Sequence, residues 1–204
     1  MIIDLRDYTT SPGARDRLIE RCEALFFPEQ ERLGATLVGS FRDADDPDRF
    51  VWLRGMPDLA TRQRVLTEFY SDGEMWKANR DEVNTWIADS DNVLLVRPTS
   101  DLAPSATGTS IVGMYAHVEP VPLSPATIAQ LNDEVSTAIA VSGGRLLVTL
   151  ATDPSENNYP RHPIRSGEFG LVWFATFEPD RYRPLGLRSV EVRRLLPTPR
   201  SRMR

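Results

Sequence analysis

His117 is the side chain in this sequence best suited to chemistry near neutral pH. It is one of only two histidines, and imidazole is the usual general base in this range and can also bind heme iron. Residues 110–119 have the pattern of a strand, in which alternate side chains share a face, so Tyr115, His117 and Glu119 lie together. We take His117 and Tyr115 as candidate catalytic residues. The alternative is an interior histidine that is held by hydrogen bonds and has no chemical role.

Arg6, Tyr8, Trp52 and Arg54 form a second group, which could bind a ligand. Arg6 shares one face of a predicted strand with Tyr8, and Trp52 shares one face of another with Arg54. Guanidinium groups form paired hydrogen bonds with carboxylate or phosphate, and tyrosine hydroxyls donate to ligand oxygens. We expect these side chains to point away from the helices and to line one small-molecule site together with the first group.

The second group also has an interpretation that requires no ligand. Buried charges must be paired or solvated, and here the arginines would pair with Asp4 or Glu191. The tyrosines would then close the ends of the sheet, and Trp52 would pack in the core. A cavity of at least about 300 Å³ among these side chains would favour a ligand site, whereas tight pairing would favour this second interpretation.

A polar loop over residues 152–168 is longer than an ordinary connection, and such loops often act as lids. Asn158, Arg161 and Arg165 are the side chains that it could lay over a pocket, and Arg161 joins the ligand-binding candidates. We expect the neighbouring His162 to be exposed to solvent. The alternatives for this loop are a dimer contact or disorder.

The sequence lacks the usual patterns for cofactors and metals, so we predict that neither heme, flavin nor metal is needed. Cys22 is the only cysteine, is expected to be buried on a helix, and leaves the histidines without a third metal ligand. Ser142-Gly143-Gly144 indicates a turn rather than a phosphate loop. Heme is the serious competitor because of His117, but Tyr115 and Glu119 make that face polar.

Composition excludes several classes of protein. The chain has 204 residues, of which 41% are hydrophobic and 26% charged, as in ordinary globular domains. Its net charge of −5 argues against nucleic acid as a partner. No run approaches the ~20 apolar residues of a membrane span, so we expect no membrane partner. Strand-like residues begin at Ile2 and leave no room for a signal peptide, which predicts a cytoplasmic protein.

One strand pattern occurs twice in the chain. Residues 50–58 and 171–180 are apolar runs with Val-Trp near the start and Pro-Asp at the end. Ser11-Pro12 and Ser124-Pro125 each precede an amphipathic segment, as expected of a helix with a serine cap and proline in its first turn. The repetition indicates two copies of one small domain that enclose a shared cavity.

Each copy has the element order βαββαβ, the second with a helix shortened by prolines at positions 179 and 184. The expected strands cover 2–8, 35–42, 49–56 and 92–97 in the first copy, and 110–119, 145–151, 169–177 and 187–196 in the second. The expected domains are therefore 1–98 and 108–197, with a linker over 99–107 and a tail over 198–204.

This order is that of the ferredoxin-like unit, an antiparallel sheet with two helices on one face. The other face of each sheet must also be covered, and two copies in one chain can cover each other. We predict an α+β fold of two tandem ferredoxin-like units, packed sheet to sheet as an internal dimeric α/β barrel. The exposed strand edges also leave a homodimer possible.

Several segments resemble the NIPSNAP family. They are Leu5-Arg6-Asp7-Tyr8 before Pro12-Gly13, Phe41-Arg42-Asp43, Asp46-Pro47-Asp48-Arg49-Phe50-Val51-Trp52-Leu53-Arg54-Gly55, Ser90-Asp91-Asn92-Val93-Leu94-Leu95 and Asn157-Asn158-Tyr159-Pro160-Arg161. The resemblance covers most of residues 2–97 and is looser over 110–200. It implies a dimeric α/β-barrel fold but little about activity, because relatives by fold include cofactor-free monooxygenases, small isomerases and heme-binding enzymes.

Two classes of function follow from these observations. In the first, the protein binds a small organic molecule in a barrel cavity, as a cofactor-independent monooxygenase or an isomerase would. In the second, it is a non-catalytic protein-interaction or scaffold module. An open cavity containing His117 would favour the first class, and a filled barrel with an exposed apolar patch the second.

Overall fold

The computed structural model describes residues 1–101, 111–177 and 190–203, with the backbone alone for 111–118, 190 and 191. The strands are β1 (Ile2–Thr10), β2 (Thr36–Asp43), β3 (Arg49–Met56), β4 (Ile87–Asp89), β5 (Val93–Pro98), β6 (Ile111–Glu119), β7 (Arg145–Thr152), β8 (Phe169–Thr176) and β9 (Val190–Pro197). The helices are α1 (Arg15–Arg21), α2 (Phe27–Arg32), α3 (Leu59–Leu66), α4 (Glu74–Asn84) and α5 (Pro125–Val141), with π-helical segments η1 (Cys22–Phe26) and η2 (Thr67–Asp72).

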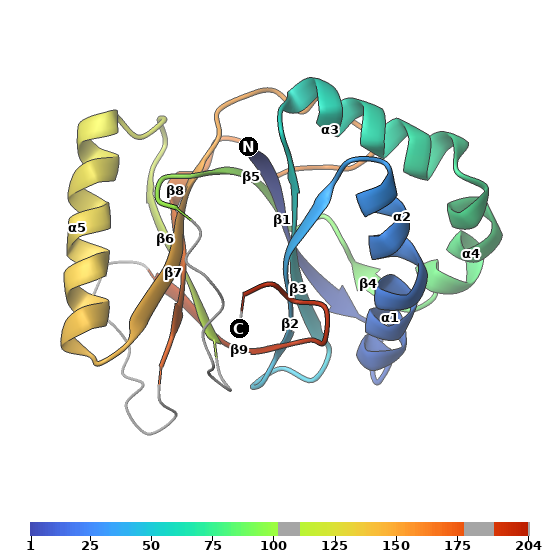
Figure 1. Ribbon diagram of the computed structural model, residues 1–204, viewed down its shortest axis with the longest axis horizontal. Coiled ribbons are helices and arrows are strands. Elements are labelled where there is room, and N and C mark those ends of the chain that lie inside the picture. The colour runs from blue at the N-terminus through green and yellow to red at the C-terminus, as the bar shows by residue number, and fades with distance from the viewer. Residues whose placement is uncertain (102–110, 178–189, 204) are drawn as a thin grey trace.

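A curled antiparallel sheet lies between two outer layers of helix (Figure 1). Helices α1, α2 and α4 cover one side, and α5 covers the opposite side. The strands pair in the order β3-β2-β9-β6-β8-β7-β5-β1, and β1 also pairs with β3. The pairings therefore return to their starting strand, so the α+β fold is barrel-like.

The strands of the two halves follow the same order in this sheet. Those of the first half run β5-β1-β3-β2, and those of the second run β9-β6-β8-β7. Counted along the chain, and leaving out the short β4, each half therefore has its fourth strand at one edge, β5 or β9, and its second strand at the other, β2 or β7. The halves meet through β2 with β9 and β5 with β7, and each junction has three residue pairs.

Alternation along the strands sends apolar side chains into the space between the two halves. Ile3 and Leu5 of β1 join Val51 of β3 with Val172 and Phe174 of β8 in one buried cluster. Each such fully buried side chain contributes roughly 1.5–3 kcal/mol through the hydrophobic effect. The interior of the barrel, over the described residues, is therefore an apolar core rather than the polar pocket that we expected.

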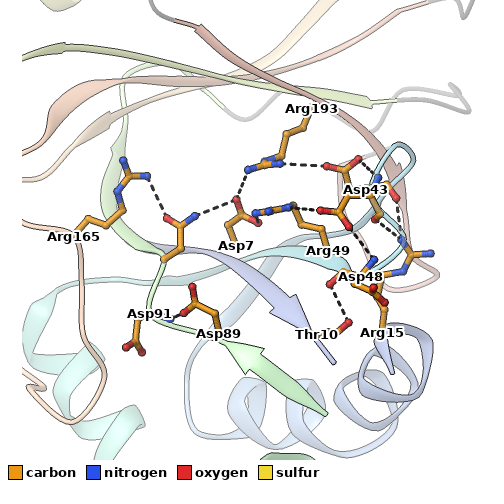
Figure 2. Close-up of polar contacts among 12 residues, drawn as sticks. Asp7, Thr10, Arg15, Asp43, Asp48, Arg49, Asp89, Asp91, Arg165 and Arg193 are labelled. Atoms are coloured by element: carbon orange, nitrogen blue, oxygen red, sulfur yellow. Dashed lines mark hydrogen bonds and ion pairs between the residues drawn. The ribbon is translucent and has the colours of Figure 1, made fainter. Parts of the chain in front are cut away.

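Charged side chains close one end of this core and join the two halves (Figure 2). Asp7 of β1 pairs with Arg49 of β3 (Oδ1 to Nη1, 3.1 Å) and with Arg193 of β9 (Oδ2 to Nη2, 2.9 Å). Arg193 also reaches Asp43 of β2, Nη1 to Oδ2, at 3.5 Å. Each arginine here has a carboxylate partner, so the network balances its own charge.

One of the two predicted serine caps forms, at Ser124, and Asp58 caps a further helix. Asp58 accepts a hydrogen bond from the backbone nitrogen of Thr61 at the start of α3, and Ser124 caps α5 in the same way. The prediction at Ser11 is wrong, because α1 begins at Arg15. The Ser11 hydroxyl instead donates to the Thr85 carbonyl, which fixes the chain before the helix begins.

Both helical segments of the first half contain a π turn. The chain is helical without a break from α1 through η1 to α2, and from α3 through η2 until Gly73. The π turns shift the helix face by part of a turn, and such turns are frequent at functional sites. Cys22, Phe26 and Tyr70 belong to them and line one cavity, described below.

The C-terminal segment is not the free tail that we expected. Thr198, Ser201 and Met203 are buried, and Met203 belongs to the core between the two halves. The Thr198 hydroxyl donates to Ser40 Oγ at 2.9 Å. The segment thus packs against β2 and covers part of the barrel core.

Candidate functional site

A buried ion-pair cluster lies between β1, β3 and the helices. Asp4 accepts from Arg54 Nη2 and from Arg62 Nε, both at 2.7 Å, and all three residues are at most 1% exposed. Burial alone would raise the pKa of Asp4, but the guanidinium groups of Arg54, Arg62 and Arg6 hold it at about 2. Asp4 is therefore ionised, and one carboxylate holds two arginines.

A third buried arginine in this cluster, Arg6, has no carboxylate partner in the part of the chain that the structure describes. Its Nε donates to the Tyr8 hydroxyl oxygen at 2.7 Å, and its Nη2 lies 3.3 Å from His162 Nδ1. Its guanidinium also lies over the Trp52 ring, 5.6 Å from the centroid. Because Nη1 is buried without a partner, the donors of Arg6 exceed the acceptors around it.

The cluster consequently carries a surplus of positive charge. Three guanidinium groups, of Arg6, Arg54 and Arg62, face the single carboxylate of Asp4. Glu31 at the edge of the cluster pairs outward, with Arg200 at 2.7 Å and with Arg202 at 3.1 Å. Besides Arg6 Nη1, the buried donors Arg54 Nε and Arg62 Nη2 also lack partners, as expected of a cluster short of acceptors.

His162 is held as a neutral imidazole by its neighbours. Burial and the nearby Arg6 and Arg54 guanidiniums lower its pKa to about 3. A guanidinium can only donate hydrogen bonds, so Nδ1 accepts from Arg6 and the ring proton is on Nε2. His162 thus offers an N–H donor, with the positive charge of Arg6 directly behind it.

Tyr8, like His162, accepts a hydrogen bond from Arg6 and keeps a proton that it can donate. Its oxygen accepts from Arg6, so its own proton points elsewhere. Burial raises the pKa of this hydroxyl far above its ordinary value, and Arg6 offsets only part of that rise. Tyr8 is therefore a second protonated donor polarised by Arg6.

These donors line a cavity of about 100 Å³ between the sheet and the helices. Its walls are mostly aromatic, and its lining includes Tyr8, Cys22, Phe26, Phe27, Gln30, Trp52, Tyr70, Trp76, Val83 and His162. The less buried Asn84, Ile87 and Ser90 form its outer part. The Trp52 indole N–H is buried without an acceptor and adds a third donor. The cavity is smaller than the volume of about 300 Å³ that we set as favouring a ligand site, so its size alone does not support one.

The loop between β7 and β8 completes this site from the second half of the chain, passing above the sheet towards α3 (Figure 1). Arg62 Nη1 donates to Asn158 Oδ1 at 2.6 Å, and Asn158 Nδ2 donates to the Leu59 carbonyl at 2.6 Å. Tyr159 shares a hydrogen bond with Ser71, which also accepts from Arg161. These contacts hold His162 against the Tyr70 ring, with centroids 4.1 Å apart.

Four of the predicted ligand-binding residues meet at this site, but on the opposite face of the sheet from the one expected. Arg6, Tyr8, Trp52 and Arg54 lie toward the helices, and Tyr8 and Trp52 belong to the cluster that includes Phe27 of α2. Both faces of β1 are almost wholly buried. The charged side chains on its helix side can be buried because they form ion pairs and hydrogen bonds within the cluster. Arg161, the fifth, lies on the covering loop and contacts Ser71 rather than the cavity.

The predicted catalytic residues, His117 and Tyr115, are not brought to this cavity by the strand pairing. Their side chains are outside the described residues. Their backbone lies in β6, where Tyr115 pairs with Val172 and Glu191, and His117 pairs with Gly170. Because β6 pairs with β8 and β9 but not with β1 or β3, the two predicted groups belong to different parts of the sheet.

Sequence reasoning missed Arg62 and Tyr70 and assigned His162 to the solvent. Arg62 is a fully buried residue within a helix, and no periodicity marks a charged residue as buried. The motif Asn157-Asn158-Tyr159-Pro160-Arg161 was the available signal for His162, since it indicated a covering loop. The prediction that His162 is exposed to solvent is wrong, because this side chain is mostly buried and lines the cavity.

The described residues contain neither a metal-binding cluster nor a membrane-spanning helix. Among residues 1–101, 111–177 and 190–203, no three His, Cys, Asp or Glu side chains are grouped so as to hold a metal ion. No helix in the same ranges is both long and apolar enough to cross a membrane.

Burial raises the pKa of the Cys22 thiol far above its ordinary value, so this cavity residue is unreactive.

Solved structures share the fold of the whole chain at low sequence identity. A candidate monooxygenase from Lactobacillus acidophilus matches 96% of this chain and 93% of its own, with a TM-score of 0.56 and 14% identity. An anthrone oxidase-like protein matches 97% of this chain and 91% of its own, with a TM-score of 0.58 and 10% identity. A comparison with curated protein sequences finds no match. These likenesses concern the fold alone.

A sequence model of the NIPSNAP family matches residues 3–102. That range holds β1 to β5, the helices that cover them, and most of the residues that line the cavity. The first half of the chain is therefore a NIPSNAP domain, which confirms the resemblance of its sequence to that family.

Proposed function

We propose that this protein binds a small organic molecule in the cavity between the NIPSNAP-domain sheet and its helices. The observation that carries the proposal is the pairing of aromatic walls with donors on Tyr8, His162 and Trp52 that have no acceptor in the described structure. Apolar pockets with a few placed polar groups are the usual form of a ligand site. At about 100 Å³, the cavity fits a short chain, or a ring that extends partly beyond it.

The same geometry supports a chemistry in which an oxygen atom of the ligand becomes more negative. Donors fixed in a water-poor site stabilise such an oxygen, as an oxyanion hole does. An isomerase would in addition need a residue that takes a proton from one carbon and returns it to another, but His162 has its Nδ1 occupied by Arg6 and a pKa of about 3. An acidic substrate can lose its proton to water and then react with O₂, so of the two enzymatic classes the site favours a monooxygenase that uses no cofactor.

In that reaction the substrate itself is the reductant. A methylene next to a carbonyl gives up its two hydrogens, one atom of O₂ enters the carbon as a carbonyl oxygen, and the other leaves as water. The balance is R₂CH₂ + O₂ → R₂C=O + H₂O. Tyr8 and His162 would hold the enolate or phenolate oxygen, and Trp52 and Phe27 would hold the ring. The name of the anthrone oxidase-like relative is compatible with such chemistry.

Binding to the cavity can be tested with its own tryptophans. Trp52 and Trp76 line it, so we expect small aromatic ketones and phenols to quench their fluorescence, and native mass spectrometry of fresh protein to find a retained molecule. Cys22→Leu fills the cavity and is expected to abolish quenching, whereas Val141→Leu on an exposed position (84% exposed) leaves it unchanged.

The scaffold interpretation remains the alternative and makes the opposite prediction. If none of the probes quenches fluorescence and Cys22→Leu only stabilises the fold, the cavity is a packing defect and the protein is a non-catalytic interaction module. If quenching survives in Cys22→Leu, the ligand lies elsewhere, and His117 and Tyr115 of β6 become the next candidates.

We further propose that the chain is an internal pseudo-dimer of two ferredoxin-like units, over about 1–98 and 108–197. The equal strand order of the two halves supports this, as does the serine cap that opens α5. Expression of the two segments as separate chains tests it, since the pair should reassemble into a complex with native fluorescence. Failure of the mixed segments to associate would argue against two matched units.

A further inference from the structure

We propose that the ligand of this cavity is an oxyanion, an enolate, phenolate or carboxylate, rather than a neutral molecule, and that its oxygen binds between Tyr8 and His162. This inference rests on the proposed function, because it names the class of ligand for the same site. Its basis is the surplus of positive charge around Arg6 and the absence of any acceptor to match it among the described side chains.

The charge balance of the site favours an anion over a neutral ligand. Both oxygens of Asp4 are already engaged, because each lies 2.7 Å from one arginine nitrogen, of Arg54 or of Arg62. In the part of the chain that the structure describes, the hydrogen bonds of Arg6 are only with the neutral Tyr8 and His162. A buried charge without a counterion is costly, and an anion on the far side of Tyr8 and His162 would supply that counterion.

The hydrogen bonds of the side chains that line the cavity also favour an anion over a neutral ligand. Arg6 occupies an acceptor position on both Tyr8 and His162, which leaves each of them with a proton to donate. Arg54 donates to Gln30 Oε1 at 2.8 Å, so the Gln30 amide also keeps N–H groups to donate. These side chains line one cavity, and a site made of donors selects a ligand that only accepts.

The cavity is suited to a single negative oxygen on a small organic body. Arg6 itself does not line it, so the charge acts through two neutral donors, an arrangement that fits a monoanion better than a doubly charged phosphate. The volume of about 100 Å³ is below the roughly 150 Å³ that holds benzene in an engineered cavity. A ring therefore fits only if part of the ligand extends past Asn84 and Ser90.

The lining also cannot create the anion by taking a proton. Tyr8 and Cys22 stay protonated because burial raises the pKa of each, and the lone pair of His162 is used by Arg6. The ligand must consequently be acidic enough to arrive ionised, or lose its proton to water as the site stabilises the anion.

An optical titration with 4-nitrophenol tests the inference, because its phenolate absorbs at longer wavelength than the phenol. With the full chain, we expect bound nitrophenol to be the phenolate at pH values where the free compound is largely protonated, a pKa decrease of at least about one unit, or tenfold in ionisation. Tyr8→Phe should remove most of this decrease. Val141→Leu, at an exposed position outside the cavity, should retain it.

A second pair of probes separates the possible sources of the oxyanion. Benzoate binding much more tightly than benzamide by tryptophan quenching, with an unshifted nitrophenol, would identify a carboxylate site, whereas a shifted nitrophenol with weak benzoate would identify an enolate or phenolate site. Nitrophenol bound without a pKa change, together with equal affinity for benzoate and benzamide, would overturn the oxyanion inference but keep a small-molecule site. Failure of all three probes to bind would overturn both proposals.

Discussion

The guanidinium of Arg6 and the imidazole of His162 are in contact although 156 residues separate them in the sequence, with Nη2 3.3 Å from Nδ1. Arg6 belongs to the first half of the chain and His162 to a loop of the second. The contact fixes the histidine as an Nε2–H donor, because the guanidinium has no lone pair to offer. The NIPSNAP domain thus depends on the second half for one wall of its cavity.

Stability should decrease as the pH falls below the ordinary pKa of histidine. The pKa of His162 is about 3 in the folded protein and about 6.5 in an unfolded chain, so between these values only the unfolded state binds the proton. The free energy of unfolding therefore falls as the pH drops from about 6.5 toward 3. Urea unfolding across this range should show a shallower pH dependence in His162→Asn than in the wild type.

Val141→Leu, at an exposed position, is the control for that experiment, because it changes no titratable group. We expect it to leave the pH dependence close to that of the wild type. Equal slopes in wild type and His162→Asn would contradict the assignment of a buried neutral imidazole.

Asp4→Asn should destabilise the protein strongly. The substitution keeps the shape of the side chain but leaves Arg54 and Arg62 buried without a counterion, and breaking a buried pair typically costs about 3–5 kcal/mol. The matched control, Asp16→Asn, removes an exposed carboxylate that pairs with Arg42, a class of pair worth at most about 1 kcal/mol. Chemical denaturation measures both, and similar losses in the two variants would contradict the role of Asp4.

Asn158→Ala should release the loop that covers the cavity. It removes the 2.6 Å hydrogen bonds with Arg62 and with the Leu59 carbonyl, so we expect trypsin to cleave after Arg161 or Arg165 several-fold faster. Ser166→Ala, at an exposed position of the same loop, is the control. Unchanged cleavage in Asn158→Ala would mean that the aromatic contacts of His162 suffice to hold the loop.

Gly39→Ala should disturb the C-terminal segment. An added Cβ would lie 2.5 Å from Met203 Cε and 2.6 Å from Phe41 Cε2, and overpacking of a core typically costs about 1–3 kcal/mol. Adding Met203→Ala to Gly39→Ala should recover part of that loss, since the two side chains compete for one space. Strictly additive losses in a double-mutant cycle would contradict this contact.

The sequence by itself determined the positions of most strands and which side chains share a face. Strand alternation and capping chemistry act over a few residues, so the cap at Ser124 and the shared face of Arg6 with Tyr8 could be read locally. The repeated strand pattern likewise predicted that the two halves are alike, and the NIPSNAP resemblance is confirmed over residues 3–102. The extra strand β4 and the start of α1 were not predicted.

Only the tertiary structure decided which face of β1 turns inward and what reaches its other face. Both faces are buried, so polarity alone does not distinguish the barrel core from the layer beneath the helices. Asp4 and Arg6 can lie under helices because Arg54, Arg62 and His162 arrive there from other elements to satisfy them. Those partners are distant in sequence, and their convergence depends on the folding of the whole chain.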